Sequence, residues 1–452
     1  MHAYIPHTQH DRREMLNEIG VSSAEELFDV IPRELQLGRP LNLPQALSEQ
    51  ELLTHMNALA EKNKRPLSFL GAGAYEHHIP SVVNHILMRS EFYTSYTPYQ
   101  AEISQGMLQC IFEYQTMIAQ ITGMDVSNAS LYDGATATSE AAFMAVNVTR
   151  RNKVLVPWNV HPQTRQVLRT YCNAAGITLI ELENQDGLSL QEIIERSLDH
   201  DTAGVILQNP DFFGCIEDLQ GIADIVHNNK SLLIASVEPI SLALLKPPGQ
   251  SGVDIAVGDG QSLGNPLSFG GPSLGFMAVK ENLLRRMPGR IVGQTKDQDG
   301  RRGFVLTLQA REQHIRRQKA MSNICSNQAL NALAATVYLA TLGKEGFVEL
   351  ATLCMNKAHY AKDLICAIPG FELAFDSPFF CEFAIKCPGN AENIAQQVLQ
   401  DAQILPGYYL GQEYPELSNG LLIAVTETKT RQDIELLADA LAKAAVTGGD
   451  LA

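Results

Sequence analysis

The sequence predicts an α/β protein: a large domain with a mainly parallel sheet, a smaller C-terminal α+β domain and an N-terminal helical arm. Six short runs rich in Val, Ile and Leu alternate with amphipathic helical segments between about residues 66 and 280. From about residue 327, a long helical stretch precedes alternating strand-like segments and a last helix. A chain of 452 residues is long enough for two or three such domains.

The order of these patterns predicts the domain boundaries. We expect a helical arm over residues 1–65, because Ser23 and Ser48 each begin a Ser-x-x-Glu capping box. The large domain is expected over residues 66–326, with strands at 153–157, 178–183, 204–210, 231–238, 254–260 and 274–280. Residues 327–452 are expected to form a linking helix and the small domain. Ligands of such sheets bind outside the carboxyl ends of the strands.

Composition excludes several classes of function. The formal net charge is −16 and the chain carries no basic tract long enough to follow a phosphate backbone, so we expect no nucleic-acid partner. The polar N-terminus and the absence of a long apolar run predict neither a signal peptide nor a membrane span. Eight cysteines without a Cys-x-x-Cys pair are typical of a reducing compartment. We therefore expect a cytoplasmic protein.

The domain pattern suggests the pyridoxal phosphate (PLP) enzymes with the aspartate aminotransferase type of fold, called fold type I. Gly134, Ala135 and Thr136 begin an Ala-rich helix and could hold a phosphate, although ordinary helix capping explains them equally well. Glu238 ends a strand where an acid could face the pyridine nitrogen, but a solvated carboxylate fits the sequence as well. No lysine lies between Lys246, which precedes two prolines and is expected at the surface, and Lys280.

Two further stretches are candidates for binding. Tyr96, Tyr99 and Gln100 belong to the densest concentration of tyrosines in the chain, just before an amphipathic helix. Packing at an interface is favoured for them, and a small polar substrate pocket remains the alternative. His77 and His78 are neighbours and would point to opposite faces of a strand, so we expect polar loop histidines and no metal site.

Seven motifs together resemble one family, the P-protein of the glycine cleavage system, which is glycine decarboxylase. They cover about residues 66–330 and occur in the family's order: FLGAGAYEHHIP, YTPYQAEISQG, NASLYDGATA, QNPDFFGCIED, GQSLGNPLSFGGPSLGF, MPGRIVGQT and REQHIRRQKAMSNICSNQAL. Within this family, the chain has the length and the character of an N-terminal half, and in this it resembles subunit 1, the α chain of the split form. In the split form, subunit 1 pairs with a homologous subunit 2.

The resemblance implies how the two subunits divide the chemistry. Matching the proline and glycines places Gln261 where the PLP-carrying half has its lysine, and Gly260 where that half has a histidine. Because Gln cannot form an imine, the cofactor is expected on subunit 2, and Gly134, Ala135, Thr136, Glu238 and Gln261 would form a vestigial site. The implied reaction converts glycine and the lipoylated H-protein into aminomethyl-lipoyl-H-protein and CO2.

The implied assembly is an α2β2 heterotetramer, and three readings of this chain's role remain open. It could shape the partner's pocket, with Tyr96, Tyr99 and Gln100 as hypothetical contributors. It could instead be a non-catalytic scaffold that stabilises subunit 2. The third reading is an independent PLP-fold enzyme that uses an unusual lysine such as Lys246.

Overall fold

The computed structural model describes residues 4, 6–185 and 187–448. The chain divides into two compact units, Met1–Arg65 and Pro66–Ala452. The first unit contains α1 (Gln9–Ile19) and α2 (Glu49–Ala60), and none of the residues in these two helices is buried.

The helix starts of the first unit confirm one sequence signal and contradict another. The capping box at Ser48 and Glu51 is formed at the start of α2. Residues 23–32 do not form the expected α-helix: Glu25–Phe28 is a single 3-10 turn without a side-chain cap. The carboxylate of Glu26 accepts from the N–H and the hydroxyl of Ser22, one residue before the predicted cap.

The second unit is built on a seven-stranded sheet in the order β2-β8-β7-β6-β5-β3-β4. Neighbouring strands from β7 through β6, β5 and β3 to β4 run parallel, and β8 and β2 are antiparallel to their neighbours. All six predicted strands are present. The seven strands of the sheet are β2 (Val126–Ser127), β3 (Lys153–Pro157), β4 (Thr178–Leu182), β5 (Thr202–Asn209), β6 (Leu232–Val237), β7 (Ile255–Asp259) and β8 (Gly275–Val279), and the six predicted ones are β3 to β8.

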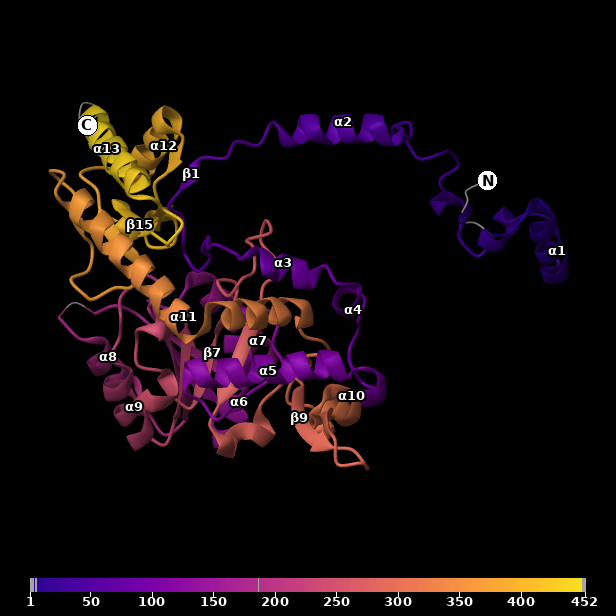
Figure 1. The fold of residues 1–452 in the computed structure, drawn as a ribbon, viewed down its shortest axis with the longest axis horizontal. Coiled ribbons are helices and arrows are strands. Elements are labelled where there is room, and N and C mark those ends of the chain that lie inside the picture. Colours follow the sequence, from indigo (N-terminus) through magenta and orange to yellow (C-terminus); the bar gives the residue numbers. More distant parts are fainter. Residues whose placement is uncertain (1–3, 5, 186, 449–452) are drawn as a thin grey trace. The chain divides into compact units, whose positions relative to one another are not determined.

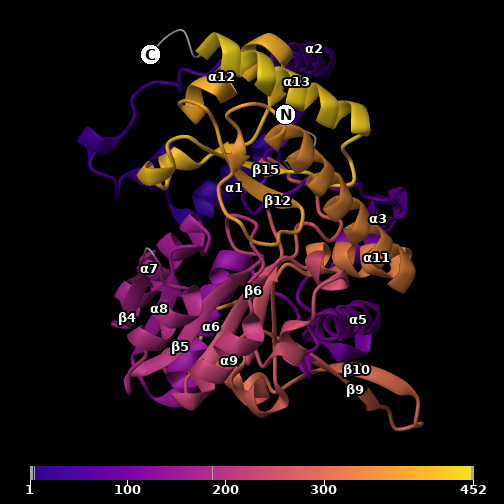
Figure 2. The same ribbon diagram turned by 90° about the vertical axis from the view of Figure 1, so that its left-hand side faces the viewer.

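Helices cover both faces of this sheet, as the apolar composition of its strands requires (Figure 2). Alternate residues of each strand point to opposite faces, so Val205 and Ile206 belong to different core clusters. On one face lie α6 (Gly134–Thr149) and α7 (Pro162–Ala175). On the other lie α5 (Gln105–Thr122), α9 (Leu219–Asn228) and the start of α11 (Ala329–Cys366). The shorter helices are α3 (Ser81–Leu87), α4 (Ser90–Tyr93), α8 (Leu190–Ser197) and α10 (Gln313–Arg316).

The C-terminal part packs around its own core. Helix α11 leads into it and changes direction at Gly343, where φ is 60° and ψ is −173°, so Figure 1 shows two helical segments. An antiparallel sheet in the order β11-β12-β15-β14 follows, packed against two helices. These elements are β11 (Glu372–Leu373), β12 (Glu382–Lys386), α12 (Ala391–Ala402), β14 (Tyr408–Tyr409), β15 (Gly420–Ala424) and α13 (Arg431–Gly448).

Two small pairings complete the second unit. Strand β1 (Leu67–Ser68) runs parallel to β13 (Ile404–Leu405). An antiparallel hairpin joins β9 (Ile291–Lys296) to β10 (Arg302–Thr307). Among the helices that the structure describes, none combines the length and the apolar character that crossing a lipid bilayer requires.

Candidate functional site

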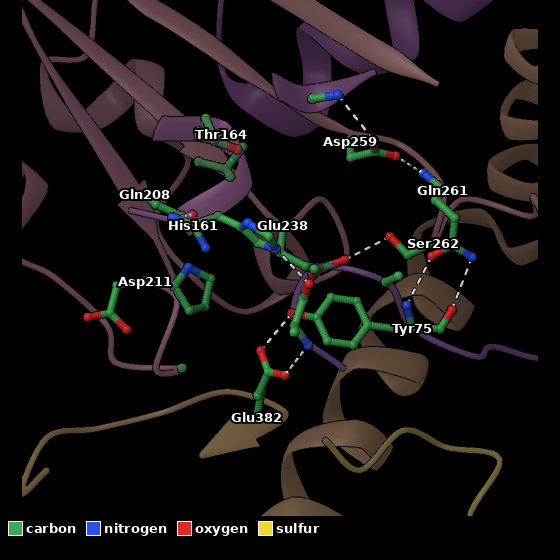
Figure 3. Close-up of a pocket in the computed structure, with 18 of the residues that line it drawn as sticks. Tyr75, His161, Thr164, Gln208, Asp211, Glu238, Asp259, Gln261, Ser262 and Glu382 are labelled. Carbon is green, nitrogen blue, oxygen red and sulfur yellow. Dashed lines mark hydrogen bonds between the residues drawn. The ribbon is translucent and has the colours of Figure 1, made fainter. Parts of the chain in front are cut away.

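A cavity of about 300 Å³ lies at the carboxyl ends of the parallel strands, where ligands of such sheets bind (Figure 3). Four of these strands supply residues from their ends or from the loops that follow them. His161 follows β3, Asp211 follows β5, Glu238 follows β6, and Gln261 follows β7. Glu382, at the start of β12, lines the cavity from the C-terminal part.

The start of helix α6 forms one wall of the cavity, and two carboxylates occupy it. Asp133 is the N-cap, and its Oδ1 accepts from the backbone N–H of Thr136 at 2.8 Å. Asp259, at the end of β7, accepts through Oδ2 from the N–H of Gly134 at 3.0 Å. Its other oxygen accepts from the N–H of Gln261 and from the hydroxyl of Ser273. The helix start that the sequence suggested for a phosphate therefore already holds acidic side chains.

The side chain of Gln261 lies in the cavity wall and is fully engaged. Its Oε1 accepts from the N–H of Tyr75 at 3.0 Å. Its Nε2 donates to the carbonyl oxygens of Tyr75 at 3.0 Å and of Asn265 at 2.8 Å. The amide thus joins the loop after β7 to residues 71–76, which we call the strap.

The strap is also tied to the rest of the cavity. The carboxylate of Glu382 accepts from the N–H of Ala72 at 2.7 Å and from the hydroxyl of Tyr75 at 2.8 Å. On the other side, His161 Nε2 lies 2.7 Å from the carbonyl oxygen of Ala72. Because this carbonyl can only accept, the Nε2 atom carries the proton. The strap therefore crosses the cavity between the large sheet and β12.

Burial raises the pKa values of several acids around the cavity. Burial raises the pKa of Glu382 to about 7, and burial together with nearby Glu217 raises the pKa of Asp211 to about 8. Burial also raises the pKa of Glu238, whose oxygens accept from Ser262 and from the N–H of Ser241. No Lys or Arg is present among the described residues that line the cavity, so these acids have no cation beside them there.

The structure brings most of the predicted vestigial site together. Gly134, Ala135, Glu238 and Gln261 all line the cavity, and Thr136 lies next to them in the first turn of α6. Glu238 is partly buried and hydrogen-bonded, so it is not the solvated strand-end carboxylate that was its alternative.

Several site residues were missed by sequence reasoning: Tyr75, His161, Asp211, Asp259 and Glu382. Asp211 and Asp259 could have been found, because each ends or follows a predicted strand. Glu382 could not, since it lies in the C-terminal part of the chain.

Other candidate residues lie outside the cavity. The side chains of Tyr96 and Tyr99 are 83% and 51% exposed, and Gln100 is exposed beside them. The hydroxyl of Tyr99 accepts from Arg290 at 3.0 Å. Lys246 is exposed and its Nζ lies 3.4 Å from Gln220, so it is not placed to reach the cavity.

The histidine pair differs from expectation. The side chain of His77 is only 4% exposed, and its Nδ1 lies 2.7 Å from Glu427 Oε2, with the thiol of Cys354 3.4 Å from the same oxygen. Their ligand-type atoms lie within 4.8 Å of one another. The distance between His77 and Glu427 is that of a hydrogen bond, so the side chain of His77 is buried and paired. Both histidines lie in a loop, as expected, and His78 is exposed.

The fold and the position of the cavity define the class: a protein of the PLP-dependent fold type I. Glutamate decarboxylase of Lactobacillus brevis has this arrangement at a TM-score of 0.69 and only 12% identity, covering 95% of this chain and 98% of that one. The crystal structure of an inhibitor-bound glycine decarboxylase (P-protein) of the glycine cleavage system matches at a TM-score of 0.89 and 44% identity. That match covers 98% of this chain and all of the other.

Sequence comparison identifies the family of this chain within the fold type I proteins. Residues 2–441 match the glycine cleavage system P-protein family. The probable glycine dehydrogenase (decarboxylating) subunit 1 of Desulforamulus reducens is 57% identical over 438 residues, which cover 96% of this chain and 98% of the relative. The chain belongs to the glycine cleavage system P-protein family, as its motifs indicated.

The residues of this cavity do not fit PLP. A Schiff base needs a lysine amine, and none of the described lining residues is a lysine. A phosphate needs several free N–H groups or cations, whereas the N–H groups of Gly134 and Thr136 are taken by Asp259 and Asp133, which leaves that of Ala135. The chain therefore has the fold of a PLP enzyme without a cavity suited to the cofactor.

Proposed function

We propose that this chain is subunit 1 of a split glycine decarboxylase in the glycine cleavage system. The complex converts glycine and the lipoylated H-protein into aminomethyl-lipoyl-H-protein and CO2, and subunit 2 carries the PLP. Family membership and the name of the relative at 57% identity support this function. The proposed assembly is an α2β2 heterotetramer in the cytoplasm.

One observation supports the proposal that subunit 2, and not this chain, carries the PLP. At the end of β7, where the resemblance expects the lysine, stands Gln261, whose amide makes three hydrogen bonds to Tyr75 and Asn265. These hydrogen bonds make the side chain a structural tie, and its nitrogen is not nucleophilic because the lone pair of an amide is delocalised into the carbonyl group. The imine-forming lysine then has to belong to subunit 2.

Within the complex, we propose that Tyr96, Tyr99 and Gln100 lie at the interface with subunit 2 and line its glycine or lipoyl pocket. Their exposure leaves the hydroxyl of Tyr96 available to a partner. Tyr99 is held in place by Arg290, which lies 5.4 Å from the centre of its ring. A hydroxyl held in this way can donate to a polar substrate at little cost in conformational entropy.

The test compares this chain alone, subunit 2 alone and the two together. We expect the exchange of labelled CO2 into the carboxyl group of glycine, in the presence of lipoylated H-protein, only when both subunits are present. We also expect borohydride reduction to label a lysine of subunit 2. Exchange catalysed by this chain alone, or a pyridoxyl-lysine in it, would contradict the proposal.

A second function, a non-catalytic scaffold, is favoured by the position of the three candidate residues outside this chain's own cavity. The Tyr96→Phe variant separates the two functions, because it removes only the hydroxyl. A fall in kcat of the complex with unchanged assembly indicates a contribution to the pocket. Unchanged turnover and unchanged assembly indicate a scaffold. Tyr93→Phe, another half-exposed tyrosine of the same segment, is the matched control.

A further inference from the structure

In the first turn of α6, the N–H groups of Gly134 and Thr136 already have carboxylate acceptors. A helix start offers N–H groups and a partial positive charge, which normally attract phosphate. Here Asp259 Oδ2 accepts from the N–H of Gly134 at 3.0 Å, and Asp133 Oδ1 accepts from the N–H of Thr136 at 2.8 Å. The two oxygens of Asp259 together accept from Gly134, Gln261 and Ser273, and burial raises the pKa of this carboxyl group.

Close packing leaves no room for a second anion beside this carboxylate. A Cβ added to Gly134 would lie 3.0 Å from both the Cβ and the backbone nitrogen of Asp259. A Cβ added to Gly275 would lie 2.5 Å from the carbonyl oxygen of Asp133. The ends of β7 and β8 are therefore pressed against the helix start, and a phosphate could reach the N–H of Gly134 only by displacing Asp259.

The described lining residues also offer no cation to attract the same ligand. Besides Asp133 and Asp259, the wall of the cavity contains Asp211, Glu238 and Glu382, and none of the described lining residues is a lysine or an arginine. Burial raises the pKa of Asp211 to about 8 and that of Glu382 to about 7, so the missing cation opposes a phosphate more than repulsion by these acids does. A phosphate dianion would meet acids on several sides and no cation.

We propose that the carboxylate of Asp259 is a built-in anion that takes the place of a phosphate at the start of α6, so that this chain rejects phosphorylated ligands. This inference deepens the proposed function, since it adds a second reason, independent of Gln261, why PLP is carried by subunit 2. The rejection extends to non-covalent binding, for which a lysine is irrelevant.

The test measures binding to the full chain of pyridoxamine 5′-phosphate, which has no aldehyde to react with surface lysines. The fluorescence of Trp158, the only tryptophan of the chain, and calorimetry are the two readouts. Asp259→Ser removes the carboxylate. Glu382→Gln is the matched control, because it removes a carboxyl group from the same cavity but away from α6.

We expect no saturable binding to the wild-type chain or to Glu382→Gln. Asp259→Ser should bind one ligand per chain, roughly 100-fold or more tightly than the wild type, the factor that removal of one like charge near the phosphate represents. Inorganic phosphate should compete, and pyridoxamine without the phosphate should not bind. Asp259→Asn, which keeps the size of the side chain, serves if the serine variant does not fold.

Three results would overturn the proposal. One is phosphate-dependent binding to the wild-type chain within about tenfold of the variant. Another is an equal gain in affinity in Glu382→Gln, which would mean that the total charge of the cavity, and not the carboxylate of Asp259, prevents binding. The last is no gain in a variant of Asp259 that keeps the wild-type circular dichroism spectrum. None of these readouts involves turnover. The proposed function is tested separately, by the exchange reaction of the two subunits.

Discussion

At the scale of single residues, Gln261 and Asp259 lie close together at the end of β7. They differ in how much of their role could be predicted from the sequence. Matching to the family identified Gln261 as a residue that cannot form an imine. The hydrogen bonds of its amide could not be foreseen, since Tyr75 lies 186 residues away along the chain. Asp259 belongs to a predicted strand end, but only the fold brings it against Gly134, 125 residues earlier.

Replacement of Gln261 by alanine should destabilise the chain by about 1–3 kcal/mol, because the N–H and the carbonyl of Tyr75 lose partners in a half-buried setting. Chemical denaturation followed by circular dichroism measures the free energy of unfolding. Gln166→Ala, at an exposed position of α7, should change it by less than about 0.5 kcal/mol. Equal effects of the two substitutions would show that the amide is not a structural tie.

The raised pKa of Glu382 predicts a dependence of stability on pH. Burial raises this pKa to about 7 from an ordinary value of 4.5, so the folded chain binds the proton more tightly than the unfolded chain. The stabilisation is complete below about pH 4.5 and is lost as the pH rises through 7.

Glu382→Gln removes this titration, so we expect its melting temperature to fall less than that of the wild type between pH 5 and pH 8, about the range that the pKa change spans. Glu416→Gln, at an exposed glutamate, should leave the wild-type slope unchanged. Parallel curves for the wild type and Glu382→Gln would contradict the prediction.

At the scale of elements, the strands were predictable and some helices were not. Strands buried on both faces are continuous apolar runs, so β3 and β5 to β8 could be found from composition alone, and the edge strand β4 is also rich in Leu and Ile. The segment at 23–32 carried a correct-looking Ser-x-x-Glu signal, but it forms only a 3-10 turn with no buried residue. Helix formation depends on packing more than on capping, and this segment packs against too little.

Gly214, in the loop after β5, should tolerate no side chain. Its φ is 88°, and an added Cβ would lie 1.9 Å from the carbonyl oxygen of Glu382. Gly214→Ala should therefore destabilise the chain by about 3 kcal/mol or more through strain and displacement of β12. Gly389→Ala, where an added Cβ meets no atom within 4 Å, is the control and should be nearly neutral. Thermal unfolding of both variants checks this.

At the scale of the whole molecule, the two units differ in how their folding is supported. Residues 66–448 contain the buried clusters around the two sheets. The helices of the first unit are 11 and 12 residues long and bury no side chain. Exposed apolar residues on α2 include Leu52, Leu53 and Met56.

A peptide of residues 1–65 should accordingly be mostly unstructured in water, because helices shorter than about 12–15 residues are marginal without packing. Far-ultraviolet circular dichroism is the measurement. The same peptide with Ser48→Ala should be less helical still, since it loses the cap of α2. A cooperative thermal transition of the unmodified peptide would contradict this expectation.

The ties around the strap make the loss of cofactor chemistry hard to reverse. A single change of Gln261 to lysine would supply an amine but would remove the three hydrogen bonds that hold Tyr75 and Asn265. It would also leave Asp259 at the start of α6. A lineage that carried this chain would need coordinated substitutions, with less stable intermediates, to regain an independent active site. Under the proposed function, the dependence of this chain on subunit 2 is thus built into the hydrogen bonds of its own core.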